Sequence, residues 1–292
     1  MKYPKVSIVT VNYKQPLVTC ELLDSIDLLN YPNLETIIVD NAQSYDDSPL
    51  YRYHLPGVKV INCEENLGFA GGNNRGIQEA TGDYVLLLNN DTEIQNGLIE
   101  QLLDVFESED NIGAVSPILK YFEQPERIQY AGFTEINSVT GRNQLIQQKP
   151  TKKLTDSPYF HGAAVMIPKH VIDDCGLMPE EYFLYYEELE WSRIISQKGY
   201  KIKVLNSAEV LHKESITTGK NSPLKVYYQN RNRVHYMRRG SKFAFFLAFF
   251  LLFSLPKNVV NHMLKLEWKH VKAHFTAFNH SIISPRFGQQ SF

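Results

Sequence analysis

The strongest candidate for chemistry is an acidic turn that follows a very apolar segment. Residues 84–88 read YVLLL, and the chain continues directly with Asn89, Asn90, Asp91 and Thr92. The apolar run predicts a strand buried on both faces, so Asp91 would lie just beyond its carboxyl end. A carboxylate there can hold a divalent cation, and hard oxygen ligands suit Mg²⁺ or Mn²⁺. A turn or a helix N-cap is an equally common structural role for such a residue.

A second candidate is a cluster of acids and aromatics. Residues 179–191 read PEEYFLYYEELEW. A carboxyl group against an apolar wall has a raised pKa, which suits a general base. Glu187 and Glu188 would point in different directions on a helix, so they need not share a task. The alternative is a charged helix start, stabilised by the helix dipole. We favour that alternative for Glu180, Glu181 and Glu190.

A glycine-rich turn precedes both of these segments in the sequence. Residues 66–76 read NLGFAGGNNRG and lead into a predicted helix. Glycines let a backbone approach a ligand closely, and a helix N-terminus favours an anion. The turn has neither the GxGxxG pattern after the first strand nor the GK[ST] of a P-loop, which disfavours an ordinary dehydrogenase or ATPase. A tight loop that needs positive φ is the structural alternative.

The elements that must position these residues alternate regularly. Apolar periodicity predicts strands at residues 6–11, 36–39, 58–61 and 84–88, and helices at 17–29, 69–80 and about 98–106. Such alternation implies a mostly parallel sheet covered by helices, which binds ligands at the carboxyl ends of its strands. The polar residues at those ends are Asn12, Tyr13, Asp40, Asn41, Asn89, Asn90 and Asp91.

The pattern loosens after residue 115. We expect residues 120–160 to be largely irregular. A strand at 163–167, a helix at 187–198 and a strand at 200–205 follow. His161 and His212 lie near these elements, and a lone histidine is more often structural than a ligand.

Charge is distributed unevenly along the chain. The net charge of −2 combines −12 over residues 1–224 (19 basic, 31 acidic) with +10 over residues 225–292 (11 basic, and Glu267 as the one acid). A basic tail indicates an anionic partner, either nucleic acid or a membrane surface. Its aromatic residues form one block and do not alternate with basic ones, which disfavours nucleic acid.

That aromatic block is residues 243–255, FAFFLAFFLLFSL. As a helix these 13 residues would be about 20 Å long, shorter than a bilayer core of about 30 Å. We therefore expect a basic, Phe-rich helix lying in the membrane interface, not a spanning helix. A buried core helix is the alternative.

Composition and cysteine content restrict the class of protein. Hydrophobic residues make up 43% of the 292 and charged residues 21%, which excludes a disordered or collagen-like chain. Three widely spaced cysteines argue against a disulfide framework and fit a reducing cytosol. We expect a cytoplasmic protein bound peripherally to the inner face of the cell membrane.

Taken together, several segments resemble the family 2 inverting glycosyltransferases of the GT-A fold, and among them the rhamnosyltransferase-like branch. The matching segments run in family order over residues 6–239. They are residues 6–13 (VSIVTVNY), 38–41 (IVDN), 66–74 (NLGFAGGNN), 86–91 (LLLNND), 162–164 (GAA), 183–188 (FLYYEE) and the region 212–233. Each match is modest by itself, but seven in order are specific.

The resemblance implies roles for individual residues. Thr10, Asn12 and Asp40 would meet the nucleobase and ribose of a nucleotide-sugar donor, and Asn73 and Asn74 would contact the donor from the glycine-rich turn. Residues 89–91 take the place of the DXD motif, with Asn89 and Asn90 beside the donor and Asp91 on a metal ion. His212 would complete the metal shell, and Glu188 would be the catalytic base.

Three positions depart from the family pattern. Asn89 stands where the first Asp is usual, although asparagine is common there in this branch. Glu188 replaces the more usual Asp and reaches one methylene further. Arg193 lies one place earlier than expected.

The implied fold is α/β, a Rossmann-like GT-A sheet with a C-terminal helical membrane-associating appendage. The implied domains are a catalytic domain at 1–225 and a basic, Phe-rich helical region at 226–292. The catalytic domain would divide into a nucleotide-sugar half at about 1–115 and an acceptor half at about 116–225.

The implied reaction is metal-assisted inverting transfer with Mg²⁺ or Mn²⁺. The donor would be dTDP-rhamnose or a UDP-sugar, with rhamnose preferred. The acceptor would be a lipid-linked or cell-surface polysaccharide at an anionic membrane surface. The alternative is a non-catalytic nucleotide-sugar or carbohydrate binding module of the same fold.

Overall fold

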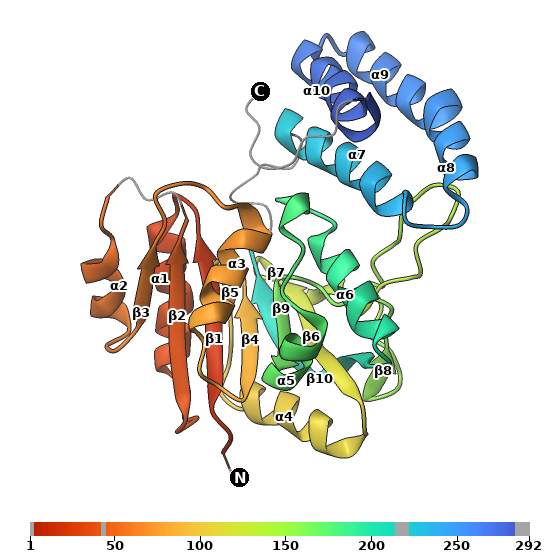
Figure 1. Cartoon of the computed structure of the whole chain (residues 1–292). Coiled ribbons are helices and arrows are strands. Elements are labelled where there is room, and N and C mark those ends of the chain that lie inside the picture. The colour runs from red at the N-terminus through yellow and green to blue at the C-terminus, as the bar shows by residue number, and fades with distance from the viewer. Residues whose placement is uncertain (1–2, 42–44, 214–221, 284–292) are drawn as a thin grey trace.

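A ten-stranded mixed sheet forms the centre of the molecule in the computed structural model, which describes residues 3–41, 45–213 and 222–283 (Figure 1). The strand order along the main path is β3-β2-β1-β4-β9-β6-β10-β5, with β7 beside β6 and β8 beside β10. The strands are β1 (Val6–Asn12), β2 (Leu34–Asp40), β3 (Lys59–Asn62), β4 (Tyr84–Leu88), β5 (Thr92–Glu93), β6 (Ile112–Tyr121), β7 (Gln124–Tyr130), β8 (Leu154–Asp156), β9 (Ala164–Pro168) and β10 (Lys201–His212).

The first four long strands, β1 to β4, are parallel, as their alternation with helices predicted. From β9 onward most pairings are antiparallel, so "mostly parallel" describes the N-terminal half only. One face of the sheet packs against α1 (Pro16–Asp27) and α4 (Leu98–Ser108). The other face packs against α3 (Gly68–Glu79), α5 (Lys169–Cys175) and α6 (Glu187–Gln197). Helix α2 (Ser48–His54) lies beside α1.

The region 120–160 is less irregular than predicted. β6 and β7 form an antiparallel hairpin that occupies residues 112–130, and β8 adds a short strand. The hairpin was missed because β7 reads QPERIQY, which is polar and mostly exposed, so it lacks apolar alternation. β10 extends seven residues past the predicted 200–205 and carries His212 at its end.

The glycines of α3 serve close packing. A Cβ at Gly76 would lie 2.3 Å from Val9 Cγ1, and one at Gly72 would lie 2.8 Å from Val11 Cγ1, so α3 can approach β1 only where side chains are absent. Gly68 has φ +74°, and a Cβ there would lie 2.4 Å from the carbonyl oxygen of Phe183. The positive-φ alternative is therefore confirmed at Gly68, and the loop that precedes α6 crosses directly over this turn.

The C-terminal helices form a separate layer above the sheet: α7 (Pro223–Met237), α8 (Phe243–Phe249), the π-helical turn η2 (Phe250–Ser254), α9 (Leu255–Leu264), α10 (Trp268–Phe278) and η3 (Asn279–Ile283) (Figure 1). The predicted boundary between 225 and 226 falls inside α7.

The Phe-rich helix is longer than predicted. α8, η2 and α9 run on as one 22-residue helix, Phe243–Leu264, whose most apolar 18-residue window has a mean hydropathy of 1.9. At 1.5 Å per residue it would reach about 33 Å, so the argument that it is too short to cross a bilayer is wrong. Only 17% of that window is buried, so the buried-core alternative is also wrong.

Candidate active site

Polar side chains from three strand ends meet in one buried network. Asn12 Nδ2 donates to Asp40 Oδ1 at 3.0 Å, and Thr19 Oγ1 donates to Asn12 Oδ1 at 3.0 Å. Asn90 Nδ2 donates to Thr19 Oγ1 at 3.1 Å, which ties the turn after β4 to the same network. Burial raises the pKa of Asp40, whose second oxygen accepts from the Tyr51 hydroxyl at 3.3 Å. Three of the residues predicted to bind the nucleotide-sugar donor, Asn12, Asp40 and Asn90, are thus brought together.

Asp91 and His212 face each other, although they lie 121 positions apart in the sequence. Asp91 Oδ1 and His212 Nε2 are 3.1 Å apart, and both side chains are more than 90% buried. The other ring nitrogen, Nδ1, lies 2.7 Å from Gln129 Oε1. Because an amide oxygen only accepts, Nδ1 carries the hydrogen, and in the neutral ring Nε2 presents a lone pair toward Asp91.

This arrangement fits a bound cation. Within the described part of the chain, Asp91 Oδ1 is buried and accepts no hydrogen bond. A carboxylate oxygen and an imidazole lone pair that face one another form a suitable pair of ligands, and Gln129 fixes the orientation of the ring as an outer partner. The backbone N–H of Lys213 donates to the Asp91 carbonyl at 2.9 Å and holds the two strand ends together.

Glu188 lies in the first turn of α6 as a partly buried acid. Its Oε2 is buried without a hydrogen-bond partner in the described residues, and burial raises the pKa of Glu188 to about 7. Glu187 beside it is 3% exposed, and burial together with the charge of Glu188 raises its pKa well above the ordinary value.

The segment 161–162 links Glu188 to the Asp91–His212 pair. A Cβ placed on Gly162 would lie 3.9 Å from Glu188 Cβ. The ring of the preceding residue, His161, has its centroid 6.1 Å from that of His212. The predicted base, Glu188, and the predicted metal ligands, Asp91 and His212, therefore lie on either side of the segment 161–162.

The loop that precedes Glu188 is held by α7. Three of its residues, Phe183, Tyr185 and Tyr186, have φ between +63° and +75°, which L residues adopt at a cost. Asn232 Nδ2 contacts the carbonyl oxygens of residues 182, 184 and 185 at 2.7–2.9 Å. Arg231 Nη2 donates to the carbonyls of residues 181 and 182 at 2.7 and 2.8 Å. Helix α7, which spans the predicted domain boundary, therefore orients the acidic loop.

Three other residues predicted to bind the nucleotide-sugar donor lie outside this network. Asn74 uses its whole amide internally: Nδ2 donates to the Met178 carbonyl and to Glu180 Oε1, each at 2.8 Å, and Oδ1 accepts from Met178 N–H. Asn73 Nδ2 donates to the Phe69 carbonyl within its own helix. The buried hydroxyl of Thr10 has no partner in the described residues.

Sequence reasoning missed Gln129, Arg231 and Asn232. Gln129 lies in the unpredicted strand β7, and Arg231 and Asn232 lie in the matching region 212–233, in which only His212 was given a role. Arg231 and Asn232 are 0–1% exposed, and their role can be recognised only once their carbonyl partners are placed. Residues 214–221 of the matching region 212–233 lie outside the described residues.

Arg193, whose position departs from the family pattern, has a local partner. It forms a two-point ion pair with Glu190, at 2.6 and 3.0 Å. Glu190 is 2% exposed and also pairs with Arg239. Glu190 is therefore a structural acid at the start of α6, as predicted.

Comparisons with known proteins agree with this fold. The family model "Glycosyl transferase family 2" matches residues 7–176. The low-salt glycan biosynthesis hexosyltransferase Agl10 of Haloferax volcanii is 27% identical over 241 residues, 78% of this chain and 73% of its own. The N-acetylglucosaminyl-diphospho-decaprenol L-rhamnosyltransferase of Mycobacterium tuberculosis is 23% identical over 240 residues, 73% of this chain and 77% of its own.

A solved structure shares the fold. The crystal structure of GalNAc-T7 with UDP, GalNAc and Mn²⁺ has a TM-score of 0.71 at 18% identity, covering 97% of this chain and 58% of that chain. The sheet order, the family match over more than half of the sequence and this likeness agree with one another. The chain belongs to glycosyl transferase family 2.

Proposed function

We propose that this glycosyltransferase moves a sugar from a nucleoside-diphosphate sugar to an acceptor hydroxyl in one inverting displacement. The observation that supports this most directly is that Glu188 and the Asp91–His212 pair flank the segment 161–162. Rhamnose is the sugar that we favour, because a rhamnosyltransferase is among the relatives.

The donor would bind at the strand ends. Asp40, Asn12 and Asn90 would bind or position the nucleoside together with Thr10, whose buried hydroxyl is free to pair. Asn73 and Asn89 remain expected donor contacts, and Asn74 is left out because its amide is fully used. Asp91 and His212 would hold Mg²⁺ or Mn²⁺, which when bound neutralises charge on the departing diphosphate.

Glu188 acts on the acceptor. Its carboxylate takes the proton from the acceptor hydroxyl as the oxygen bonds to the anomeric carbon. The bond to the diphosphate oxygen breaks on the opposite face and leaves its electron pair with the diphosphate. A pKa of about 7 makes Glu188 a stronger base than an ordinary carboxylate. No covalent sugar–enzyme intermediate is formed, so one base is sufficient, unlike the two carboxyl groups of a glycosidase.

Removal of Asp91 tests the metal and donor site. Asp91→Ala should weaken nucleotide binding in the presence of Mn²⁺ by at least about 10-fold, because a metal ligand is lost. Without Mn²⁺ the variant and the parent should bind nucleoside diphosphate equally, as measured by calorimetry. Asp104→Ala, which removes an exposed acid of α4, is the control. Equal Mn²⁺-dependent affinity in Asp91→Ala and the parent would contradict the assignment.

The alternative function, a non-catalytic binding module, is separated from the enzyme by turnover. A thermal-shift screen of dTDP-rhamnose, UDP-hexoses and UDP-galactofuranose with Mg²⁺ or Mn²⁺ would identify the donor. Hydrolysis of that donor by the isolated protein would then exclude the binding module. Binding without any hydrolysis or transfer would favour it.

We propose that the protein acts at the cytoplasmic membrane surface. Phe245, Leu252 and Leu264 on the long helix are 69–81% exposed, and Trp268 on α10 is 58% exposed. Two basic residues just before this helix have partners inside the protein: Arg239 pairs with Glu181 and Glu190, and Arg238 donates to the Ser281 carbonyl. Apolar side chains, more than these two arginines, would therefore carry the attachment.

Two charges on this helix should release the protein from membranes. Phe245→Glu/Leu252→Glu should reduce sedimentation with anionic vesicles by about 10-fold or more, because each buried apolar side chain contributes about 2 kcal/mol. Leu17→Glu/Leu28→Glu changes two residues of equal exposure, 70% and 75%, near α1 and should sediment like the parent. Unchanged sedimentation of the first variant would rule out attachment through this face.

A further inference from the structure

A cavity of about 750 Å³ lies between the catalytic domain and the apolar helix. One wall is the loop of residues 134–144, which Figure 1 shows rising from the sheet to the C-terminal helices. The other wall is the stretch 249–258, from α8 through η2 into α9. The cavity therefore joins two parts of the chain for which we predicted separate roles, the acceptor half of the catalytic domain and the Phe-rich helix.

The loop wall is connected to both halves of the proposed active site. Phe133, just before the cavity, stacks on His161 with ring centroids 6.0 Å apart and planes 5° apart. The hydroxyl of Tyr186, two residues before Glu188, donates to the Gly141 carbonyl at 2.9 Å. An acceptor held in the cavity would thus lie beside the segment that carries the proposed base.

The polar lining favours an anion. Arg142 and Lys257 line the cavity, and its single carboxylate, Glu135, accepts from Tyr159 at 3.4 Å. Asn143 also lines it, and its buried Nδ2 has no acceptor in the described residues. The side chains of Arg142, Lys257 and Asn143 can all donate to phosphate oxygens.

A buried guanidinium adds positive charge behind this lining. Arg233 is 3% exposed, and its Nη2 donates to two neutral groups, Asn230 Oδ1 and Ser254 Oγ, at 3.1 and 3.0 Å. Ser254 itself lines the cavity. Burial, with a contribution from the nearby charge of Arg142, lowers the pKa of Arg233 to about 10. An anion in the cavity would relieve the repulsion between the two guanidinium groups.

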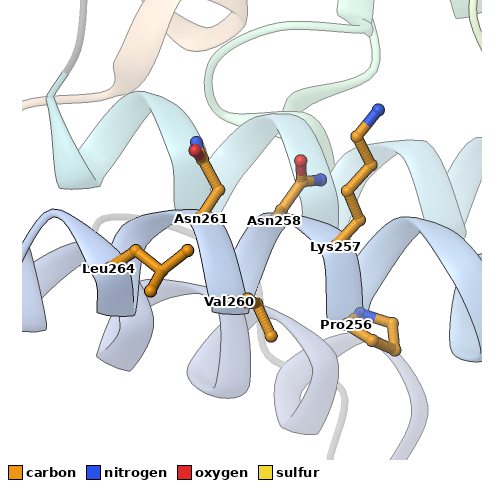
Figure 2. Close-up of a pocket in the computed structure, with 6 residues that line it drawn as sticks. All are labelled: Pro256, Lys257, Asn258, Val260, Asn261 and Leu264. Atoms are coloured by element: carbon orange, nitrogen blue, oxygen red, sulfur yellow. The ribbon is translucent and has the colours of Figure 1, made fainter.

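The apolar lining favours a lipid. Phe249 and Phe253 line the cavity, and Phe253 is 63% exposed on the helix that we place at the membrane. Figure 2 draws a neighbouring pocket on α9, in which the polar Lys257 and Asn258 extend from one side of the helix and Pro256 and Val260 from the other. A ligand with an anionic head in the cavity and an apolar tail along this helix matches both parts.

We propose that this cavity binds the phosphate or diphosphate of a lipid that carries the acceptor sugar. This inference rests on the proposed function, since it names the acceptor class of the same transferase. Arg142, Lys257 and Asn143 would hold the phosphate groups, and Phe249 and Phe253 would contact the first part of the lipid chain. The sugar would then extend along the 134–144 loop toward Glu188.

Farnesyl diphosphate is a suitable soluble probe. Its binding to the full chain is measured by calorimetry in EDTA with detergent below its critical micelle concentration, so that no metal-dependent site contributes. Farnesol supplies the tail alone, and inorganic diphosphate supplies the charge alone. Farnesyl diphosphate should bind at least 10-fold more tightly than either. Equal binding of farnesol, or of inorganic diphosphate, would overturn the proposal of a lipid phosphate site.

A matched pair of variants locates the site. Arg142→Gln/Lys257→Gln should weaken farnesyl diphosphate binding at least 10-fold. Arg127→Gln/Lys152→Gln makes the same change in net charge at exposed residues outside the cavity lining and should bind like the parent. Equal affinity of both variants would contradict the location.

The failure of this inference and that of the proposed function are distinguishable. Metal-dependent hydrolysis of the nucleotide sugar uses the proposed active site and should persist in Arg142→Gln/Lys257→Gln. If the protein hydrolyses the nucleotide sugar but shows no cavity-dependent lipid binding, the proposed function stands and the proposed lipid phosphate site is wrong. Cavity-dependent lipid binding with no activity on any nucleotide sugar would overturn the transferase mechanism instead.

Discussion

Glu188→Gln should lower the turnover of glycosyl transfer by about 10³-fold, because a positioned general base contributes about 10²–10⁴-fold. Donor affinity should change less than about twofold, since Glu188 is placed on the acceptor side and not on the nucleotide. The measurement is kcat with donor and acceptor at saturation, alongside calorimetric donor binding. Glu181→Gln, which alters a nearby acid that pairs with Arg239, is the control for loop damage. If Glu188→Gln kept most of its turnover, another group would be the base.

The same substitution should stabilise the protein at alkaline pH. Burial raises the pKa of folded Glu188 from an ordinary 4.5 to about 7, so the folded state binds more protons than the unfolded state between these values. This contribution to stability is therefore present below about pH 4.5 and is lost as the pH rises through about 7. At pH 8 Glu188→Gln should be more stable than the parent by up to about 3 kcal/mol, and at pH 4 the two should be equal.

Turnover of the parent should show the same ionisation. Its rate should rise with pH through about 7, because only the ionised carboxylate accepts a proton. As the pH rises through about 7, the free energy of unfolding should therefore fall while the turnover rises, and both changes report the ionisation of Glu188. A rate that is flat from pH 5 to pH 9 would be incompatible with Glu188 as the base.

Asn232→Leu should reduce turnover by about 10²-fold, because small displacements of catalytic groups have effects of that size. The amide of Asn232 contacts three carbonyl oxygens in the strained loop before Glu188, and its own oxygen accepts from Arg231 at 2.6 Å. Leucine has similar volume but leaves these buried groups without their partner, which should also cost about 2–4 kcal/mol of stability. The measurement is kcat, corrected for the folded fraction.

A second measurement separates positioning from stability. If Asn232 positions Glu188, the apparent pKa of the pH–rate profile should fall toward 4.5 in Asn232→Leu, because a relaxed loop exposes the carboxyl to water. Asn206→Leu removes another buried asparagine, one that bonds to the Lys152 carbonyl away from the site. It should lose stability but keep the pH–rate profile of the parent. Parallel behaviour of the two variants would show that Asn232 has only a structural role.

The sequence was most informative where local pattern and burial coincide. Strands β1, β2, β3 and β4 and helices α1, α4 and α6 were predicted within a few residues from their own apolar patterns, and α3 was predicted from its glycine-rich start. It was least informative at β7 and β8. Polar, partly exposed edge strands of this kind depend on their neighbour in the sheet and not on their own composition.

The site residues also divide into those that the local sequence pattern identified and those that depend on distant contacts. Asp91, Asp40 and Asn12 were identified because they follow apolar strands, whose carboxyl ends meet at one edge of a parallel sheet. The meeting of His212 with Asp91, and of Gln129 with His212, depends on β10 and β7 reaching that edge from far along the chain. Only the tertiary structure could show these contacts.

The amino-acid sequence alone determined the fold class, the acidic turn at 89–91 and the basic, apolar character of the C-terminal region, since these are properties of neighbouring residues. The tertiary structure decided that α7 supports the acidic loop and that the Phe-rich helix is 22 residues long and largely exposed. It also decided that a basic cavity separates that helix from the 134–144 loop. Such features join residues roughly 50 to 120 positions apart, and neither composition nor periodicity reports which distant segments meet.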